Sequence, residues 1–220
     1  MIKKTLTLAR QGAIGTLIFA VAFITIEPAT SYAVVSATSQ FTISQTVSTE
    51  IAFATPASNI IMSPTLGGIT GGTSNGATSV AVKTNNLTGY NMTIMASTSL
   101  GMQGVASSTN HIPAYISAVG GIPDYNFNTT VNGFGYNASS TDVVQAFQNN
   151  GASCNTSTVN SSSNCWLAAT TTAVTIINRN IPTPSTGATT TLSFRVNLIA
   201  NSMIPNDTYI ATTTLTATTN

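Results

Sequence analysis

The stretch TTTLSFRVNLIA, residues 189–200, indicates the fold class of this chain. Apolar side chains occupy every second position in it, at Leu192, Phe194, Val196 and Leu198. Successive side chains of a β-strand point to opposite faces of its sheet, so this spacing predicts a strand with one buried face and one more polar face.

The same two-residue period recurs along the chain. Near the N-terminus, residues 39–47 (SQFTISQTV) place Phe41, Ile43 and Val47 on one face. Near the C-terminus the alternation extends over residues 207–219. Further strands are predicted at residues 50–56, 59–64, 114–119, 131–137 and 173–179.

Two segments between these strands predict turns. Residues 78–84 and 90–97 alternate and are joined by NNLTG, residues 85–89, which predicts a β-hairpin. The stretch GGITGGTSNG, residues 67–76, is interpreted as a glycine-rich loop, and it lacks the GK[ST] ending of a phosphate-binding loop. In total, about nine to eleven short strands predict an all-β fold, an antiparallel immunoglobulin-like or Greek-key β-sandwich.

One segment departs from this rhythm. In residues 142–149, Asp142 can cap a helix and Gln145 follows three residues later, as in a capping box. Val143, Val144 and Phe147 form an apolar stripe. We therefore expect one short helix inserted between strands.

The N-terminal residues predict export. Lys3, Lys4 and Arg10 precede an apolar run, residues 13–26, and Ser31 and Ala33 match the small residues of a cleavage site. This order is typical of a secretory signal peptide, and the run is shorter than the roughly 18–20 residues that a membrane span requires. We predict a signal peptide over residues 1–33, a single β-sandwich domain over residues 34–220, and no membrane span after cleavage.

The charge of the predicted mature chain excludes several partners. After residue 33 the cations are Lys83, Arg179 and Arg195, against the four acids Glu50, Asp124, Asp142 and Asp207, for a net charge of −1. Three scattered cations do not form the basic stripe of a nucleic-acid site or of an electrostatic membrane contact. We expect no nucleic-acid partner.

The two cysteines, Cys154 and Cys165, flank a loop of Ser, Thr and Asn residues. Their spacing is not the C-x-x-C of a redox site, and a zinc site requires four ligands, which two Cys and one distant His do not supply. In an exported chain the pair predicts a disulfide. Closing a loop of about 12 residues stabilises a fold by about 3 kcal/mol, and Trp166 is expected to lead the chain back to the core.

Catalytic signals are sparse. His111 is the single histidine, no serine lies in a G-x-S-x-G elbow, and the four mature acids are isolated in sequence. A pair of Asp124 with Asp142 or Glu50 would require the fold to bring them together. We expect no enzyme activity, no metal and no cofactor.

The region 115–136 is the candidate ligand surface. It contains the aromatic residues Tyr115, Tyr125, Phe127, Phe134 and Tyr136. Aromatic rings stack on sugars, although packing in a core is their commoner role.

Several blocks together resemble a known group: FTISQTVSTEIAFATP, GGITGGTSNG, TNNLTGYNMTI, the Cys154 and Cys165 pair, TTTLSFRVN and DTYIATTTLTATTN. The chain resembles uncharacterised secreted surface proteins of candidate-phylum bacteria with reduced genomes. More loosely, the C-terminal pattern is similar to WxL-type and fimbrial β-sandwich surface proteins, although Asn206-Asp207 replaces the Gly and no W-x-L motif occurs. The resemblance implies an extracellular, cell-surface protein.

These observations lead to two functional hypotheses. The first is a secreted, noncatalytic structural or adhesive β-sandwich that contacts neighbouring surfaces or copies of itself. Its sharper version is self-assembly by strand exchange, because both ends of the mature chain, residues 34–47 and 207–219, have a strand pattern and few charges. The alternative is an extracellular carbohydrate-binding module that uses the aromatic residues of 115–136.

Overall fold

The computed structural model describes residues 36–220, so the predicted signal peptide lies outside the described residues. Contacts between residues divide the chain after Gln45, and every strand found in residues 36–220 belongs to the unit Thr46–Asn220. Among residues 36–220, no helix has the length and apolar character that a membrane crossing requires.

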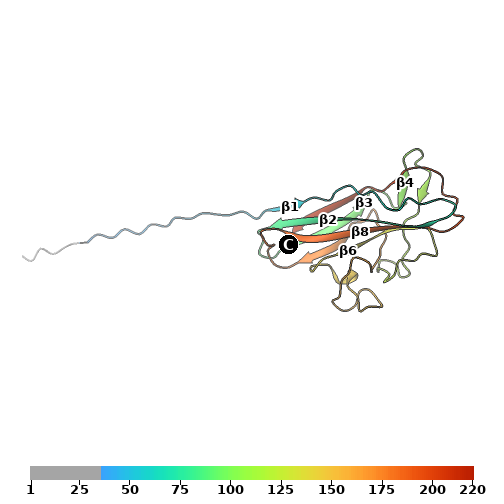
Figure 1. Ribbon diagram of the computed structural model, residues 1–220. Coiled ribbons are helices and arrows are strands. Elements are labelled where there is room, and N and C mark those ends of the chain that lie inside the picture. Colours follow the sequence, from blue (N-terminus) through green and yellow to red (C-terminus); the bar gives the residue numbers. More distant parts are fainter. Residues whose placement is uncertain (1–35) are drawn as a thin grey trace, which may run out of the picture. The chain divides into compact units, whose positions relative to one another are not determined.

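The strands form antiparallel sheets (Figure 1). The larger sheet has the order β1-β2-β8-β6, with β1 (Ile51–Thr55), β2 (Gly72–Thr84), β8 (Ala188–Leu198) and β6 (Gly133–Ser139). A second sheet has the order β10-β3-β7, with β10 (Thr213–Thr219), β3 (Tyr90–Ala96) and β7 (Val174–Arg179). A small third sheet joins β5 (His111–Ile112), β4 (Met102–Gly104) and β9 (Tyr209–Ile210). The prediction of an all-β antiparallel sandwich is confirmed.

Strand β8 lies at the centre of the larger sheet. It pairs with β2 from Gly72–Leu198 to Val82–Ala188, and with β6 on its other side. The predicted inner face of β8 is buried, from Leu192 to Leu198. It packs in one core with Tyr90, Met92 and Ile94 of β3. Burial of each such apolar side chain contributes about 1.5–3 kcal/mol.

The predicted hairpin of residues 78–84 and 90–97 is wrong. Strand β2 pairs with β1 and β8, whereas β3 pairs with β10 and β7, so the NNLTG connection crosses between the sheets. Val80 and Val82 of β2 share the core with the inner face of β3. Two strands that pair in one sheet and two strands that face each other from different sheets both place an apolar residue at every second position. The alternation in the sequence therefore could not distinguish the two arrangements.

The predicted helix at 142–149 is a single 3₁₀ turn, Gln145–Phe147. The Asp142 carboxylate forms an ion pair with Arg179 at 2.7 Å and does not cap the turn. The amide of Val144 donates to Ile176 of β7 at 3.0 Å, which holds this part of the chain extended. Pairing with β7 therefore replaces the first turn of the expected helix.

The glycine-rich stretch 67–76 is only partly a loop, because its residues from Gly72 onward belong to strand β2. Gly76 faces the core, where a Cβ atom would collide with the side chain of Ile60 and crowd that of Met62. A glycine within a strand often marks such a close approach.

Three further predicted strands are wrong. Residues 59–64 and 114–119 make only the isolated bridges Ser63–Asn75 and Ala114–Phe134. Residues 36–49 lie in neither a helix nor a strand, and all of them are exposed. An alternating pattern indicates that a segment can form a strand, but the tertiary structure decides which segments join a sheet. The short strands β4 and β5 were not predicted.

Candidate functional site

A large apolar groove opens on one side of the sandwich. Its volume is about 1440 Å³, and it is lined mainly by residues 53–69, which follow and include part of β1, and by residues 203–215, which include β9. The deepest lining residues belong to the inner face of the larger sheet: Phe134, Leu192, Phe194, Val196 and Leu198. The groove therefore reaches the main core.

Apolar side chains at the rim of this groove are exposed to water. Ile61 is 94% exposed, Met203 is 69% exposed, and Ile69 and Ile210 are also exposed. Exposed apolar patches of this kind, when contiguous, mark interaction sites in soluble proteins. The groove is thus a candidate binding site for an apolar partner.

The groove contains little polarity. Among the described residues that line it, Asp207 alone carries a charge. Ser74 also lines it, is 3% exposed, and has a hydroxyl oxygen without a hydrogen-bond partner among the described residues. A buried polar group without a partner is unfavourable, so an incoming ligand that bonds this hydroxyl would be stabilised.

Asp207 fixes the loop at residues 105–107. Its carboxylate accepts hydrogen bonds from the backbone amides of Ala106 at 3.1 Å, Ser107 at 3.3 Å and Thr208 at 2.7 Å. These bonds, led by the one from Ala106, lower the pKa of the Asp207 carboxyl. Hydrogen bonding to the charged form has this effect.

This arrangement predicts a pH-dependent contribution to stability. A carboxyl whose pKa is lower in the folded state stabilises the fold above its unfolded pKa of about 3.9, and the effect is lost as the pH falls through the folded pKa. Asp207→Asn is expected to be less stable than the unmodified protein at pH 7, with a difference that disappears in strong acid. Urea unfolding between pH 7 and pH 2 measures this, with Glu50→Gln as the control. A difference that did not vary with pH would contradict it.

The two sides of the sandwich differ in how their strand edges are covered. The edge of β6 pairs with Leu167, because Tyr136 and Leu167 exchange backbone hydrogen bonds of 2.8 and 2.9 Å. The edge of β7 is covered by residues 142–144, including a 3.0 Å bond from the amide of Asn178 to the carbonyl of Asp142. This side of the sandwich is therefore closed.

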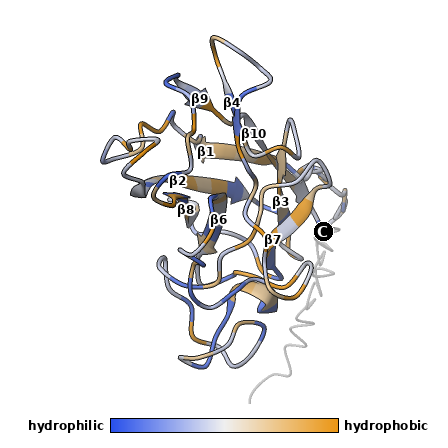
Figure 2. Ribbon diagram, turned by 90° about the vertical axis from the view of Figure 1, so that its right-hand side faces the viewer, coloured by the Kyte–Doolittle hydropathy of each residue, from blue (hydrophilic) through white to orange (hydrophobic). Residues whose placement is uncertain are grey.

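The side of β1 and β10 is open. These two strands lie together, toward the top of the view in Figure 2, away from β6 and β7. In the described chain, β10 pairs with β3 alone, and residues 76–80 of β2 have no strand partner on the β1 side. Unpaired backbone groups at a sheet edge are a template for another strand. The groove and these open edges lie on the same side of the sheets.

The structure buries most of the predicted ligand surface. Tyr115, Phe127, Phe134 and Tyr136 are between 0% and 6% exposed, and Tyr125 is half-buried. The Tyr115 hydroxyl donates to Asp124 at 2.6 Å, and burial together with this bond raises the pKa of Tyr115. These rings serve packing, which leaves little aromatic surface for a sugar.

Three of the aromatic residues form a second, smaller cluster. Tyr115, Phe127 and Trp166 pack together, and the guanidinium of Arg195 on β8 lies 4.4 Å from the centre of the Trp166 ring. From residue 165 to 169 the buried side chains alternate between the two cores, because Cys165, Leu167 and Ala169 join the main core. The chain therefore does return to the protein interior at Trp166, as predicted. Trp166 itself joins the smaller cluster, whereas Cys165 and Leu167 on either side of it join the main core.

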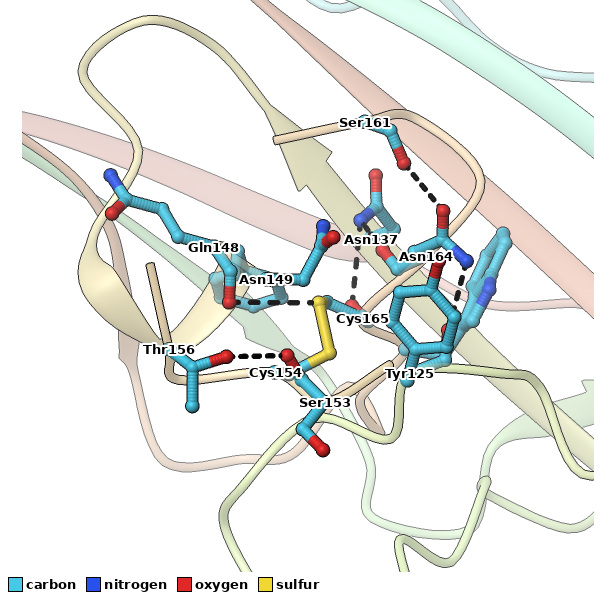
Figure 3. The surroundings of a disulfide bond; sticks show 12 residues. Tyr125, Asn137, Gln148, Asn149, Ser153, Cys154, Thr156, Ser161, Asn164 and Cys165 are labelled. Carbon is cyan, nitrogen blue, oxygen red and sulfur yellow. Dashed lines mark hydrogen bonds between the residues drawn. A yellow bond between two sulfur atoms is a disulfide. The ribbon is translucent and has the colours of Figure 1, made fainter. Parts of the chain in front are cut away.

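Cys154 and Cys165 form the predicted disulfide (Figure 3). Both cysteines are buried and pack against the main core. Polar side chains anchor the enclosed loop: the buried amide of Asn137 on β6 donates to the carbonyl of Asn164, and the amide of Asn164 donates to the carbonyl of Tyr125 at 3.2 Å. Hydrogen bonds to backbone groups thus take the place of the apolar contacts that this loop lacks.

The other candidate residues lie apart. His111 is exposed, with Nδ1 3.3 Å from the carbonyl of Thr109. Asp124 bonds Tyr115, whereas Asp142 bonds Arg179. Within residues 36–220, no group of three or more His, Cys, Asp or Glu residues is arranged to hold a metal ion.

Comparison with known proteins adds no assignment. No protein-family model matches this chain. No curated protein has significant sequence similarity to it. The resemblance to surface proteins of candidate-phylum bacteria stays a prediction.

The groove was not predicted from the sequence. Its lining comes from two segments far apart in the chain, 53–69 and 203–215, which only the fold brings together. One signal was present: Ile60, Ile61 and Met62 are consecutive apolar residues between Pro56 and Pro64. Successive side chains of an extended segment point to opposite faces, so three consecutive apolar residues cannot all be buried on one face. At least one of them is therefore exposed on the other face.

Proposed function

We propose that this chain is an exported, noncatalytic protein that acts at a cell surface as a structural or adhesive module. The observation that carries the proposal is the open side of the sandwich, where an apolar groove lies between unpaired strand edges. Such a surface suits contact with another polypeptide, because apolar area and free backbone groups are available together.

Two features support an extracellular location. The first is the disulfide between Cys154 and Cys165, because disulfides form and persist in oxidising compartments. The residues before position 34 have the pattern of a signal peptide. The carbohydrate-binding alternative has less support, since four of its five aromatic rings are buried.

Fractionation of cells that make the full-length protein tests the proposal. We expect a mature chain that begins at Val34, contains no free thiol, and is removed by protease added to intact cells. Leu17→Arg, which interrupts the apolar run, should retain the chain inside as a control. A wild-type protein found in the cytoplasm with reduced cysteines would refute export.

A further inference from the structure

Arg195 of β8 is a positive charge without an acidic partner among residues 36–220. It stands between Phe194 and Val196, whose side chains are buried in the main core, so its own side chain lies on the opposite, outer face of the larger sheet. Within residues 36–220, the single ion pair joins Arg179 to Asp142. The charge of Arg195 is therefore available to a negative group of another molecule.

Three contacts fix the position of the Arg195 guanidinium. Its central carbon lies 4.4 Å from the centre of the Trp166 ring and 5.6 Å from that of the Phe127 ring, as in a cation–π contact. Its Nε–H donates to Oδ1 of Asn75, the residue directly opposite on β2, at 2.7 Å. The residue opposite on β6 is Gly135, which leaves room for the aromatic cluster, because a Cβ atom there would lie 3.2 Å from the ring of Phe127. The guanidinium is therefore held in place before any ligand arrives.

The terminal nitrogens of Arg195 are not used by the fold. Within residues 36–220, the hydrogen bond from Nε is the only one that this guanidinium donates. A guanidinium carries its N–H donors in a planar fork, which matches the paired oxygens of a carboxylate. Arg195 thus presents a preformed carboxylate-binding group.

A pocket of about 320 Å³ adjoins this group. Its lining includes Asn75 and Ala77 of β2, which lie opposite Arg195 and Ser193 of β8. Ser162, from the loop that the disulfide encloses, also lines it. Among the described residues that line the pocket, none is acidic and Arg195 alone is cationic. Pockets for small ligands begin at about 300 Å³, so this one suits a group the size of a single sugar unit.

The other polar groups of the pocket suit the hydroxyls of a ligand. Ser162 and Ser193 each contribute a hydroxyl, and Asn75 contributes a side-chain amide. These neutral groups both donate and accept hydrogen bonds, as the hydroxyls of a sugar do. A cation for a carboxylate, beside neutral partners for hydroxyls, is the combination that a sugar acid requires.

We propose that this pocket binds a uronic acid, an acidic sugar unit of extracellular glycans, with Arg195 as the residue that binds its carboxylate. Hydrogen bonds from an arginine fork to a carboxylate supply both energy and orientation. The inference rests on the proposed function, because it names a ligand for the adhesive module.

This site differs from the carbohydrate surface expected from the aromatic residues of 115–136. Phe127 and Trp166 are 6% and 1% exposed, so a sugar does not stack on their faces. Their rings instead support the guanidinium that lines the pocket. A neutral sugar therefore lacks its main contact here.

The chain carries its own reporter for this site. Trp166 is its single tryptophan, and the Arg195 guanidinium lies over its ring. Glucuronate added to the whole chain, purified with its disulfide formed, should change the tryptophan fluorescence in a saturable way, and calorimetry should give the same affinity. Glucose and acetate should each bind at least about 10-fold more weakly, because one lacks the carboxylate and the other lacks the hydroxyls. Added salt should weaken the binding of glucuronate, since the contact is partly ionic.

Variants then separate binding from packing. Arg195→Met keeps an unbranched side chain over Trp166 and removes the charge, so it should bind glucuronate about 10–100-fold more weakly. Arg195→Lys keeps the charge but loses the planar fork, so we expect an intermediate loss. The matched control is Lys83→Met, which removes a cation from an exposed position outside the pocket and should leave the affinity unchanged. Near-UV circular dichroism checks that each variant is folded.

A further measurement needs no variant that might unfold. In the NMR spectrum of the unmodified protein, the Nε–H signal of Arg195 should move as glucuronate is added. A signal that stays in place at saturation would overturn the inference. So would a folded Arg195→Met variant with unchanged affinity, or glucose or acetate binding as tightly as glucuronate.

The localisation experiment is separate from this test. A chain that binds glucuronate but stays in the cytoplasm refutes the proposed function. An exported chain that does not bind glucuronate refutes only the pocket's assignment.

Discussion

Trp166→Ala lowers the free energy of unfolding by about 3–5 kcal/mol, which is the usual range for removing a large buried aromatic side chain. Trp166 is 1% exposed, and its ring and that of Phe127 pack in a T-shaped arrangement with ring centres 5.4 Å apart. Its indole N–H donates to the carbonyl of Ser163 at 2.9 Å, and Arg195 lies over its ring. The substitution leaves a cavity and removes all of these contacts.

The loss is expected to concentrate in the second cluster. Tyr115 and Phe127 depend on Trp166 for packing, whereas the inner faces of β3 and β8 do not contact this cluster. Urea unfolding followed by circular dichroism measures the stability, and hydrogen exchange should show faster opening at residues 114–128. Trp166→Phe is the control, because it keeps an aromatic ring and loses only part of the effect. A loss below about 1 kcal/mol for the alanine variant would contradict this account of the cluster.

Removal of the disulfide by Cys154→Ala with Cys165→Ala has the second largest expected effect, a loss of about 3 kcal/mol. The bond joins residues 11 positions apart, and the loop between them contains few buried side chains. In the chain-entropy account, the crosslink stabilises the fold by restricting the unfolded chain. Without the disulfide, the loop between positions 154 and 165 would also open more readily than the sheets.

Thermal unfolding with and without reductant measures this effect. The unmodified protein should lose stability on reduction, and the double variant should be insensitive to reductant. Amide exchange should increase at residues 149–165 while the amides of β2 and β8 stay protected. A double variant as stable as the oxidised protein would show that the hydrogen bonds of Asn137 and Asn164 suffice to hold the loop.

Much of the strand inventory could be predicted from the sequence. The apolar period at residues 189–200 located β8, and similar patterns located β1, β6 and β7. The signal worked because one face of each strand is buried, which imposes a two-residue period. The disulfide could also be predicted, since the spacing of the two cysteines and the predicted signal peptide left few other roles for them.

The candidate site could be predicted much less well. The aromatic residues of 115–136 were the candidate ligand surface, with core packing as the commoner alternative, and Phe134 and Tyr136 pack in the main core. The presence of several aromatic residues in one region does not reveal whether their rings lie on the buried or on the exposed face of a sheet. The helix at 142–149 failed for a related reason: Arg179, 37 residues away in sequence, takes the carboxylate of Asp142 that would have capped it.

By itself, the sequence determined the class of fold, most strand positions and the disulfide, because these depend on spacing between nearby residues and on the chemistry of each side chain. The tertiary structure decided which strands pair, so that β2 and β3 lie in different sheets although five residues join them. It also decided where the sandwich is closed and where it is open. Edge coverage depends on contacts between distant segments, such as Tyr136 with Leu167, and no local pattern encodes them. The groove likewise became visible only in the fold, because its lining comes from segments 53–69 and 203–215, which are far apart in the chain.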